Sequence, residues 1–577
     1  MRERLVATVE EALRTLLGEV SAGGDLPDFS LEVPRQKEHG DFACNAALLL
    51  AKRLRRPPRE LAGRLAELLA ARSELVARAE VAGPGFVNLW LVHASWQELL
   101  SRILARPEAY GRGDLLGGRR VQVEFLSANP TGPLSIGHGR QAVLGDCIAR
   151  LLDASGGKVT REYYFNNGGR QMRMLGASVK ARYLELLGRA APPPEEALRD
   201  DQAPWPETVG GLPVAFPRDG YRGEYIREIA ARILSEAGGA LVDEPPDGRF
   251  RGEAERMVFE EIRATVAALR IEFDVFYNEM SLYQEGKLDE TMADLRAQGL
   301  VYDSEGAVWL RSTQLGLDKD RVLVKSSGEP TYLLPDVAYH REKFRRGFEL
   351  VIDVQGADHY GQFPFVRAAA AALGCEPERI ELVMHQMVSL TMGGQQVRQS
   401  KRAGTFVTVD EVLAQIGPDV FRFFMIQRRS DSQLDFDLDL AREADWTKNP
   451  AYYVQYAHAR CHGVEREAER RGAALPGAQG FEAGRLELPE ELELLRKLGE
   501  FPELVSRAAA AREPHHVAYY LRELAGLWHP YLQDGKRHRI LSEDEALSLA
   551  RLALTRAVRA VLANGLALLG MSAPERM

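Results

Sequence analysis

One stretch of the chain constrains the fold more than any other. The strand-like run RRVQVEFL at 119–126 leads into the glycine-containing loop SANPTGPLSIGHG, and the helical pattern RQAVLGDCIARLLDA follows at 140–154. A strand that passes through such a loop into a helix is the opening unit of a parallel α/β sheet that binds nucleotides. The sequence therefore predicts an α/β fold around this segment.

The length of 577 residues exceeds what one hydrophobic core covers, so we expect several domains. Residues 1–95 combine helical patterns with the strand-like ending AGPGFVNLWL and predict a compact α/β module. Residues 96–440 carry the α/β fold, with an insertion at about 160–280, because 190–250 is rich in Pro, Gly and acidic residues. Long helical patterns in 441–577 predict an all-α bundle.

The last of these helical patterns has its own start and stop signals. Ser542 and Glu545 have the spacing of a capping box, and Asn564-Gly565 is a plausible break before a final short helix. We therefore expect a helix that starts after Ser542 and is interrupted near 565.

Charge, apolar runs and cysteines exclude several classes of protein. The net charge of −9 argues against indiscriminate coating of nucleic acid, although the basic clusters 52–59 and 341–346 could line an RNA path. No apolar run reaches the ~18 residues of a membrane span, and residues 1–20 form an amphipathic pattern unlike a signal peptide, so we expect a cytoplasmic protein. The four cysteines form no CxxC pair, so we expect no disulfide framework and no zinc.

The tetrapeptide Ser135-Ile136-Gly137-His138 lies where the loop turns into its helix. Exposed N–H groups and the helix dipole favour phosphate at that point. Gly137 would let a nucleotide approach the backbone, and His138 can donate a hydrogen bond to a phosphate oxygen. Taken alone, the pair favours a histidine that only caps the helix.

A second candidate is the loop RQSKRAG at 398–404, which follows a hairpin turn predicted at Gly393-Gly394. Its cations and terminal glycine fit a segment that closes on a triphosphate and neutralises charge as pyrophosphate leaves. Such loops are also common on protein surfaces. The two segments together, in one α/β domain, indicate the site of a class I aminoacyl-tRNA synthetase.

The sequence resembles bacterial-type arginyl-tRNA synthetases from about residue 30 to the last residue, most weakly in 190–250. The first segment is similar to their HIGH signature and the second to their KMSK signature. The strings that carry the resemblance are EFLSANPTGPLSIGHGRQAVLGD, EHGDFACNAALLLAKRLRRPPRELA, AGPGFVN, QSKRAGTFVTVDEVL, SDSQLDFDLDLA, NPAYYVQYAHAR and NGLALLGMSAPERM.

Two positions depart from the family pattern. Ser135 stands where the HIGH segment usually begins with histidine, and Arg398-Gln399 replace Lys-Met of the second signature. A serine hydroxyl donates one hydrogen bond but cannot become cationic. We therefore expect His138 and the basic loop to carry more of the phosphate charge.

The resemblance implies a class I Rossmann-type catalytic domain with a connective insertion, an N-terminal module that contacts the tRNA D-loop, and a helical anticodon-binding domain. It implies that L-arginine is activated with ATP and Mg²⁺ and then joined to its cognate tRNA, by a monomer. The residues that it implicates are Ser135, His138, Arg398 and Lys401 for catalysis; Gly137, His138, Asp358, His385, Gln386, Ser400 and Lys401 for ATP; Glu124, Ser127, Asn129, Tyr332, Asp336 and Gln355 for arginine; and Phe86, Asn88 and Tyr456 for tRNA.

Arginine itself sets a requirement on the pocket. Its planar guanidinium is recognised by carboxylates that bind it side-on, and Glu124 and Asp336, with Tyr332 one helical turn earlier, satisfy that requirement. Without the resemblance, Asp336 and Tyr332 would be interpreted as an exposed acid and a packed ring, and Asp358 as a helix N-cap.

Two rival functions stay open. A synthetase for another amino acid would lack the acid pair Glu124 and Asp336, because a neutral substrate does not need it. A non-catalytic RNA-binding relative is suggested only by Ser135. The retained signature residues argue against it, namely Gly137, His138, Ser400 and Lys401.

Overall fold

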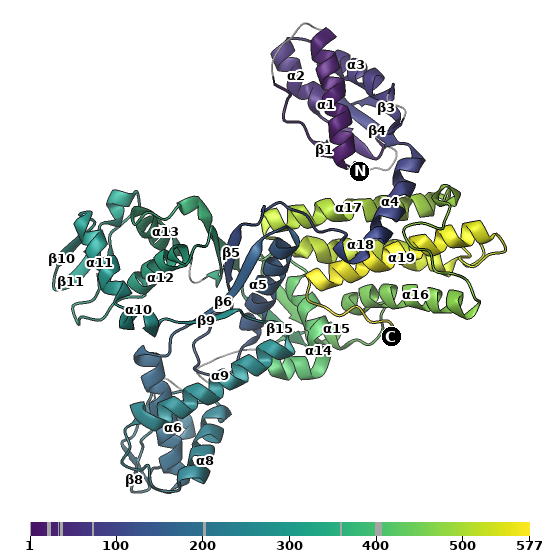
Figure 1. Ribbon diagram of the computed structural model, residues 1–577. Helices are drawn as coiled ribbons and strands as arrows, with labels where there is room; N and C mark the ends of the chain where they lie inside the picture. Colours follow the sequence, from purple (N-terminus) through teal and green to yellow (C-terminus); the bar gives the residue numbers. More distant parts are fainter. Residues whose placement is uncertain are drawn as a thin grey trace.

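The computed structural model describes residues 2–19, 25–32, 34, 39–71, 74–199, 203–357, 360–397 and 407–577. Figure 1 shows a central body from which the N-terminal module and two lobes project, with a bundle of long helices on the opposite side from the lobes. The body carries the parallel sheet, so the sheet lies at the junction of all the other parts.

The N-terminal module packs three helices on an antiparallel sheet of order β1-β2-β4-β3. The helices are α1 (Arg2–Glu19), α2 (Ala46–Leu54) and α3 (Pro58–Ala70), and the strands are β1 (Leu31–Glu32), β2 (Phe42–Cys44), β3 (Val76–Ala82) and β4 (Phe86–Leu91). Helix α4 (His93–Ala105) leads from the module into the body. Asp41 also forms an ion pair of 2.7 Å with Arg496 of the helical bundle.

The central sheet has five parallel strands in the order β14-β13-β5-β6-β9. They are β5 (Arg120–Glu124), β6 (Lys158–Phe165), β9 (Val275–Asn278), β13 (Leu350–Gly356) and β14 (Ile380–His385). Helices α5 (Ile136–Ala154), α12 (Leu333–Arg345), α13 (Phe363–Ala372) and α14 (Val409–Ile426) belong to the same domain. The predicted parallel α/β fold is confirmed, and ligands of such sheets bind beyond the carboxyl ends of the strands.

Two lobes interrupt this domain. Between β6 and β9 lies a helical lobe of α6 (Gly169–Leu186), α7 (Glu195–Arg199), α8 (Glu224–Ala237) and α9 (Arg251–Ala268), with the short strands β7 (Thr208–Val209) and β8 (Leu212–Pro213). Between β9 and α12 lies a second lobe of α10 (Met280–Gln284), α11 (Lys287–Ala297) and the strands β10 (Val301–Ser304), β11 (Ala307–Leu310) and β12 (Arg321–Val324). The first lobe lies within the expected insertion, whereas the second extends beyond it.

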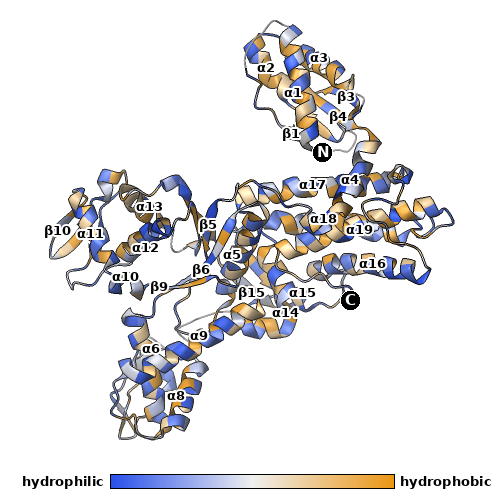
Figure 2. Ribbon diagram, viewed as in Figure 1, coloured by the Kyte–Doolittle hydropathy of each residue, from blue (hydrophilic) through white to orange (hydrophobic). Residues whose placement is uncertain are grey.

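A small sheet and a helical bundle complete the chain. Strand β15 (Val388–Met392) turns at Gly393-Gly394 into β16 (Gln395–Gln396), which confirms the predicted hairpin, and pairs with β17 (Leu434–Asp437). The short helix α15 (Leu438–Arg442) follows β17, and the bundle contains α16 (Pro450–Arg470), α17 (Pro489–Ala511), α18 (His515–Gln533) and α19 (Glu545–Leu568). Figure 2 shows polar and apolar residues mixed along these helices, and no described helix is long and apolar enough to cross a membrane.

Two predictions about α19 are wrong. The N-cap residue is Asp544, and the Ser542 hydroxyl instead donates to the Asp544 carbonyl over 3.0 Å. The helix also runs through Asn564-Gly565 without a break. A Cβ at Gly565 would lie 2.5 Å from Leu521 Cδ2, so this glycine serves close helix packing and not helix termination.

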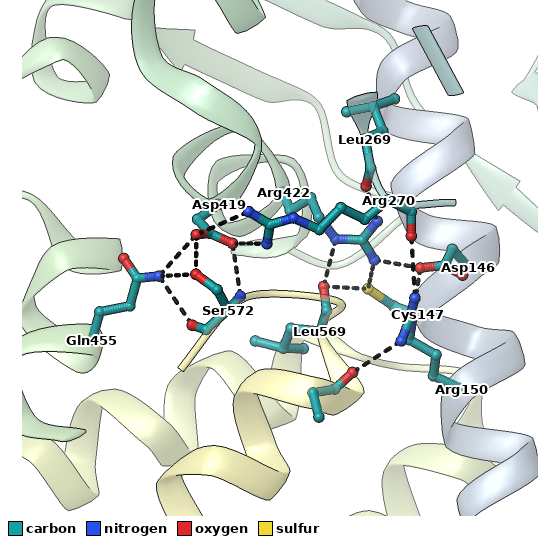
Figure 3. Close-up of polar contacts among 11 residues, drawn as sticks. Asp146, Cys147, Arg150, Leu269, Arg270, Asp419, Arg422, Gln455, Leu569 and Ser572 are labelled. Carbon is teal, nitrogen blue, oxygen red and sulfur yellow. Dashed lines mark hydrogen bonds and ion pairs between the residues drawn. The ribbon is translucent and has the colours of Figure 1, made fainter. Parts of the chain in front are cut away.

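A buried network of hydrogen bonds and an ion pair links the end of α19 to α5 and α14 (Figure 3). The guanidinium of Arg422, in α14, donates to the carbonyl oxygens of Leu569 at 2.7 Å and Leu269 at 2.8 Å, and it forms an ion pair with Asp146 of α5. The thiol of Cys147 lies 3.6 Å from the Leu569 carbonyl oxygen. Figure 3 places Asp419, Gln455 and Ser572 beside this network. The helix that follows the HIGH-like segment is therefore held by residues from the far end of the sequence.

Candidate active site

Two helices of the catalytic domain begin next to each other. Ser135 is the N-cap residue of α5, Thr408 is the N-cap residue of α14, and the two backbones form an antiparallel bridge. The Val409 amide also donates to the Leu134 carbonyl over 2.8 Å. Each helix N-terminus carries positive partial charge, so the pair favours an anion at this point. The bridge also joins the HIGH-like segment to the residues that follow the basic loop.

His138 caps the helix that it belongs to. Its Nδ1 lies 3.2 Å from the Ser135 amide nitrogen and 3.3 Å from the Ser135 hydroxyl, which makes a capping box with histidine in the third position. The amide can only donate, so Nδ1 accepts, and a neutral ring then carries its proton on Nε2. The capping role considered from the sequence is therefore present, and the ring proton that can be donated lies on Nε2.

Gly137 borders open space. A Cβ built at this position would meet nothing closer than the Ser135 hydroxyl at 3.9 Å. No described protein atom therefore requires glycine here, whereas at the neighbouring Gly139 a Cβ would lie 2.5 Å from Phe421 Cζ. The space over Gly137 is compatible with the close nucleotide approach expected from the sequence.

The basic loop lies outside the described residues, and so do Arg398, Ser400 and Lys401 within it. Asp358, after β13, also lies outside them. The roles of these four residues in catalysis and ATP binding therefore stay predictions.

Three carboxylates lie abreast on neighbouring strands of the sheet. Glu162 of β6 pairs in register with Glu124 of β5, which pairs in register with Asp353 of β13. All three are buried, with exposed fractions of 0%, 7% and 0%. We call Glu162, Glu124 and Asp353 the acid row. Since buried carboxylates are costly without compensating charge, the row needs cations nearby.

Helix α12 supplies these cations. His340, Lys343 and Arg346, which we call the cation row, follow each other at intervals of three residues, and residues so spaced share one helix face. Lys343 Nζ lies 2.7 Å from Glu124 Oε2 and 2.7 Å from Asp353 Oδ1. The remaining pairs are His340 Nε2 with Asp353 Oδ2 at 2.7 Å and Arg346 Nη1 with Glu162 Oε1 at 2.7 Å. Glu124, expected to bind arginine, is thus also an ion-pair partner within the chain.

Asp336 lies one turn before His340 on the same helix. Its Oδ2 accepts a hydrogen bond of 2.5 Å from Gln362, and no Lys or Arg among the described residues forms an ion pair with it. Burial raises the pKa of Asp336 to about 7; His340 opposes the shift, and Glu124 adds to it. Tyr332, expected on the same helix face, is the N-cap residue of α12 and is 70% exposed. Asp336 is therefore an acid of this pocket without a Lys or Arg partner among the described residues, and a ligand cation would supply one.

The loop after β5 has a strained backbone at two residues. Leu126 and Ser127 have φ values of 70° and 39°, which are unfavourable for residues with a Cβ and cluster at functional sites. The Ser127 hydroxyl donates to Glu124 Oε1 over 3.0 Å. The Asn129 side chain accepts from the Asn166 amide over 2.9 Å. Of the two side chains proposed for the amino end of arginine, Ser127 thus contacts the acid row, and Asn129 contacts the residue that follows β6.

His385 and Gln386 follow the last strand of the sheet. Gly356, next to Gln355, pairs in register with His385, so the predicted arginine and adenine segments end side by side. Arg140, which sequence reasoning missed, is 1% exposed and donates to the carbonyl of Gln386 at 2.8 Å, and to those of Ser432 and Arg429 at 2.9 Å each. Burial lowers the pKa of Arg140 to about 10. The sequence signal that could have identified Arg140 is the position of this charged residue on the apolar side of a predicted helix.

The residues proposed for tRNA lie far from this pocket. Phe86 is half-buried and Asn88 is 8% exposed, on the strand β4 of the N-terminal module. Tyr456 is half-buried, with its ring centre 4.5 Å from that of Trp446 and 5.8 Å from that of His529. Trp446 and His529 were not predicted, because only the fold brings them to the tyrosine.

One group among the described residues has donor atoms close enough for a metal ion, namely Glu513, His515 and His516, within 4.8 Å of one another. Glu513 already accepts a hydrogen bond from His516 at 2.8 Å and lies 3.8 Å from Arg429. The positive charge of Arg429 near Glu513 disfavours a metal cation at this group. The expectation of no zinc stays a prediction.

The parallel sheet, the two bridged helix starts at its edge and the attached helical bundle define a class I aminoacyl-tRNA synthetase fold. Three family descriptions match the chain in order: "Arginyl tRNA synthetase N terminal domain" over 3–91, "tRNA synthetases class I (R), catalytic domain" over 100–192 and 243–419, and "DALR anticodon binding domain" over 454–577. The chain belongs to the arginyl-tRNA synthetase family.

Relatives and solved structures agree with this assignment. The chain is 46% identical over 549 residues, 95% of each chain, to the arginine–tRNA ligase of Desulfotalea psychrophila, and 44% identical over the whole of both chains to that of Syntrophotalea carbinolica. The Thermus thermophilus arginyl-tRNA synthetase has a TM-score of 0.73 at 25% identity over all of both chains. The putative Campylobacter jejuni arginyl-tRNA synthetase has the same TM-score at 29% identity, covering 84% of this chain and 100% of that one.

Proposed function

We propose that this chain ligates L-arginine to its cognate tRNA through an arginyl-adenylate, with release of AMP and pyrophosphate. The observation that carries the proposal is the bridge between Ser135 and Thr408, in the domain that also holds the buried acids of the acid row. The bridged helix starts favour an anion and the acid pocket favours a cation, and arginyl-adenylate formation needs both. Membership of the family supports the same reaction.

The first step is in-line attack of the arginine carboxylate on the α-phosphorus of ATP, in which a P–O bond forms and the bond to pyrophosphate breaks. Positioning and electrostatic stabilisation supply most of the rate in such reactions. The start of α5 offers His138 Nε2 and the helix dipole, with Ser135 as a weaker donor. Arg398 and Lys401 would neutralise the leaving pyrophosphate, and Mg²⁺ carried by ATP would neutralise the triphosphate.

ATP would lie over the start of α5. The open space at Gly137 supports contact of the nucleotide with the backbone there. We assign Asp358 to the ribose, His385 and Gln386 to adenine, and Ser400 to the phosphates.

Arginine would enter the pocket with its guanidinium toward Asp336 and Glu124. The raised pKa of Asp336 supports this orientation, since a bound cation would stabilise the charged carboxylate. Ser127, Asn129 and Gln355 would hold the α-amino end. Tyr332, at the exposed start of α12, would cover the ligand.

In the second step, a ribose hydroxyl of the terminal adenosine of tRNA attacks the adenylate carbonyl, and AMP leaves. The helical bundle would read the anticodon, with Tyr456 as a stacking surface, and Phe86 and Asn88 would contact the D-loop. We propose that the enzyme acts as a monomer in the cytoplasm.

Pyrophosphate exchange with each of the twenty amino acids, with and without cognate tRNA, tests this proposal. Exchange should depend on arginine and on no other amino acid. Exchange with a neutral amino acid, or none with arginine in the presence of tRNA, would overturn it.

A further inference from the structure

Lys343 is a fully buried lysine whose ammonium group has a partner in every direction. Nζ lies 2.7 Å from a carboxylate oxygen of Glu124, 2.7 Å from one of Asp353, and 4.3 Å from the ring centre of Tyr339. An ammonium group has three N–H donors, so two carboxylates and one aromatic face account for all of them. Burial lowers the pKa of Lys343, but Asp353 and Glu124 raise it above the ordinary value. The lysine is therefore charged.

His340 contributes a second charge to the same cluster. Its Nε2 lies 2.7 Å from Asp353 Oδ2, and its Nδ1 lies 2.8 Å from the carbonyl oxygen of Asp336. A carbonyl oxygen and an ionised carboxylate can only accept, so both ring nitrogens donate, and only the protonated ring has two N–H groups. Asp353 is thus shared by two cations, which hold its pKa below the ordinary range although burial acts in the opposite direction.

The acid row and the cation row balance each other. Arg346 and the Tyr339 hydroxyl engage Glu162, at 2.7 Å and 2.5 Å, so three carboxylates face three cations. Glu124 is fixed at both oxygens, by Lys343 on one side and by the Ser127 hydroxyl at 3.0 Å on the other. Burial raises the pKa of Glu124, and Lys343 is the first group to oppose that rise.

Beyond the balanced rows, two acids of the pocket have only neutral partners among the described residues. Asp336 accepts from Gln362 at 2.5 Å, and Glu279 accepts from Tyr164 and Asn166 at 2.8 Å each. A ligand cation that enters this pocket therefore finds acids without a cationic partner at Asp336 and Glu279.

We propose that Lys343 is the positioning residue of the arginine pocket: it holds the Glu124 carboxylate in place and cancels its charge, so that Asp336 is left to attract the guanidinium. This inference rests on the proposed function. Lys343 acts through Glu124 and Asp353 and does not itself touch arginine. The guanidinium of arginine, bound at Asp336, would then lie one helical turn before His340 and extend the cation row along α12.

The test compares Lys343→Met with the double variant Lys343→Met/Asp353→Asn in pyrophosphate exchange with cognate tRNA. Lys343→Met leaves two buried carboxylates without their lysine, and we expect the arginine KM to rise about tenfold or more while the ATP KM stays within about twofold. The double variant removes one acid together with one cation, so it should recover at least about threefold of the lost arginine affinity. A purely structural lysine would make the double variant worse than Lys343→Met.

Lys287→Met is the matched control. Lys287 Nζ forms an ion pair of 2.9 Å with Glu342, the neighbour of Lys343 on α12, but outside the pocket. Its loss should leave the arginine KM within about twofold of wild type. Should Lys343→Met fail to fold, Lys343→Gln takes its place, because an amide donates a hydrogen bond without charge.

The outcomes separate the two proposals. Wild-type protein that fails to exchange pyrophosphate with arginine overturns the proposed function. Wild-type exchange with arginine, together with a Lys343 variant that behaves like Lys287→Met or that raises both KM values equally, overturns the role of Lys343 alone. So does a double variant without any recovery.

Discussion

Ser135 and Thr408 are bridged through their backbones, and each is the N-cap residue of the helix that follows it. A shift of either helix start therefore moves the other. The proposed phosphate site therefore depends on the HIGH-like segment and on Thr408, four residues beyond the basic loop, and substitutions at this junction should act on the chemistry and on stability together.

Replacing His138 with Ala should lower the rate of adenylate formation about 10²–10³-fold, because one preorganised donor to the developing charge is lost. Ser135→Ala should cost about tenfold, since a neutral hydroxyl donates one ordinary hydrogen bond. Ser135→Ala should also destabilise α5 by about 1 kcal/mol through its capping box. Single-turnover adenylate formation with tRNA, at saturating ATP and arginine, measures both rates. Equal losses for the two variants would show that the serine takes part in the chemistry.

Asp336→Asn should weaken arginine selection by about 2–4 kcal/mol, because a desolvated guanidinium loses its charged partner. ATP binding should barely change. Steady-state exchange with varied arginine and varied ATP gives both KM values. An arginine KM and a turnover number within about twofold of wild type would place the specificity pocket elsewhere.

The pH dependence follows from the same residue. With the pKa of Asp336 raised to about 7, the carboxylate that we propose binds arginine is increasingly protonated as the pH falls through 7, so kcat/KM for arginine should fall on that side. Bound arginine favours the charged form, so kcat should fall only at lower pH. Asp336→Asn should remove this limb of the profile. A profile for arginine that is flat from pH 6 to 8 in the wild type would contradict the assignment.

Phe86→Ala should impair charging of tRNA more than arginine activation, because β4 lies in the N-terminal module, away from the nucleotide site. Asn88→Ala should follow the same pattern with an added loss of stability, since Asn88 is only 8% exposed. Aminoacylation and tRNA-saturated exchange are compared for each variant. Equal losses in both assays would assign the strand a folding role instead.

Gly570→Ala should destabilise the protein by about 1–3 kcal/mol more than Gly472→Ala. Both glycines have positive φ, 65° and 74°, but a Cβ at Gly570 would overlap the Arg422 guanidinium, whereas one at Gly472 would meet nothing within 4 Å. Thermal unfolding of the two variants isolates the overlap from the backbone strain. Similar losses would mean that the Arg422 network tolerates displacement.

Patterns within one element were readable from the sequence. Alternation and turn residues predicted the hairpin at Gly393-Gly394, and the strand–loop–helix order predicted the parallel sheet. The second lobe was missed because strands such as β10 and β11 have four residues each, too few to show a period. At Asn564-Gly565, packing on Leu521 overrides the local signal for a break.

The residues of the candidate site show the same division between what the sequence predicts and what only the fold reveals. The spacing of His340, Lys343 and Arg346 is visible in the sequence, but their partners lie on three strands, and only the register of the sheet sets Glu162, Glu124 and Asp353 side by side. Motif reasoning could therefore name Glu124 as a ligand for arginine without revealing that Lys343 already pairs with it.

The buried polar network between α5 and the end of α19 has a consequence for synthesis on the ribosome. Cys147 and Leu569 are 422 residues apart in sequence. At roughly 5–20 residues per second, the nascent α5 waits roughly 20–85 s before its last contacts can form. During that interval its buried face, with Val143, Cys147 and Leu151, lacks part of its covering. This apolar face of α5 is therefore exposed to aggregation before translation of its own chain is complete.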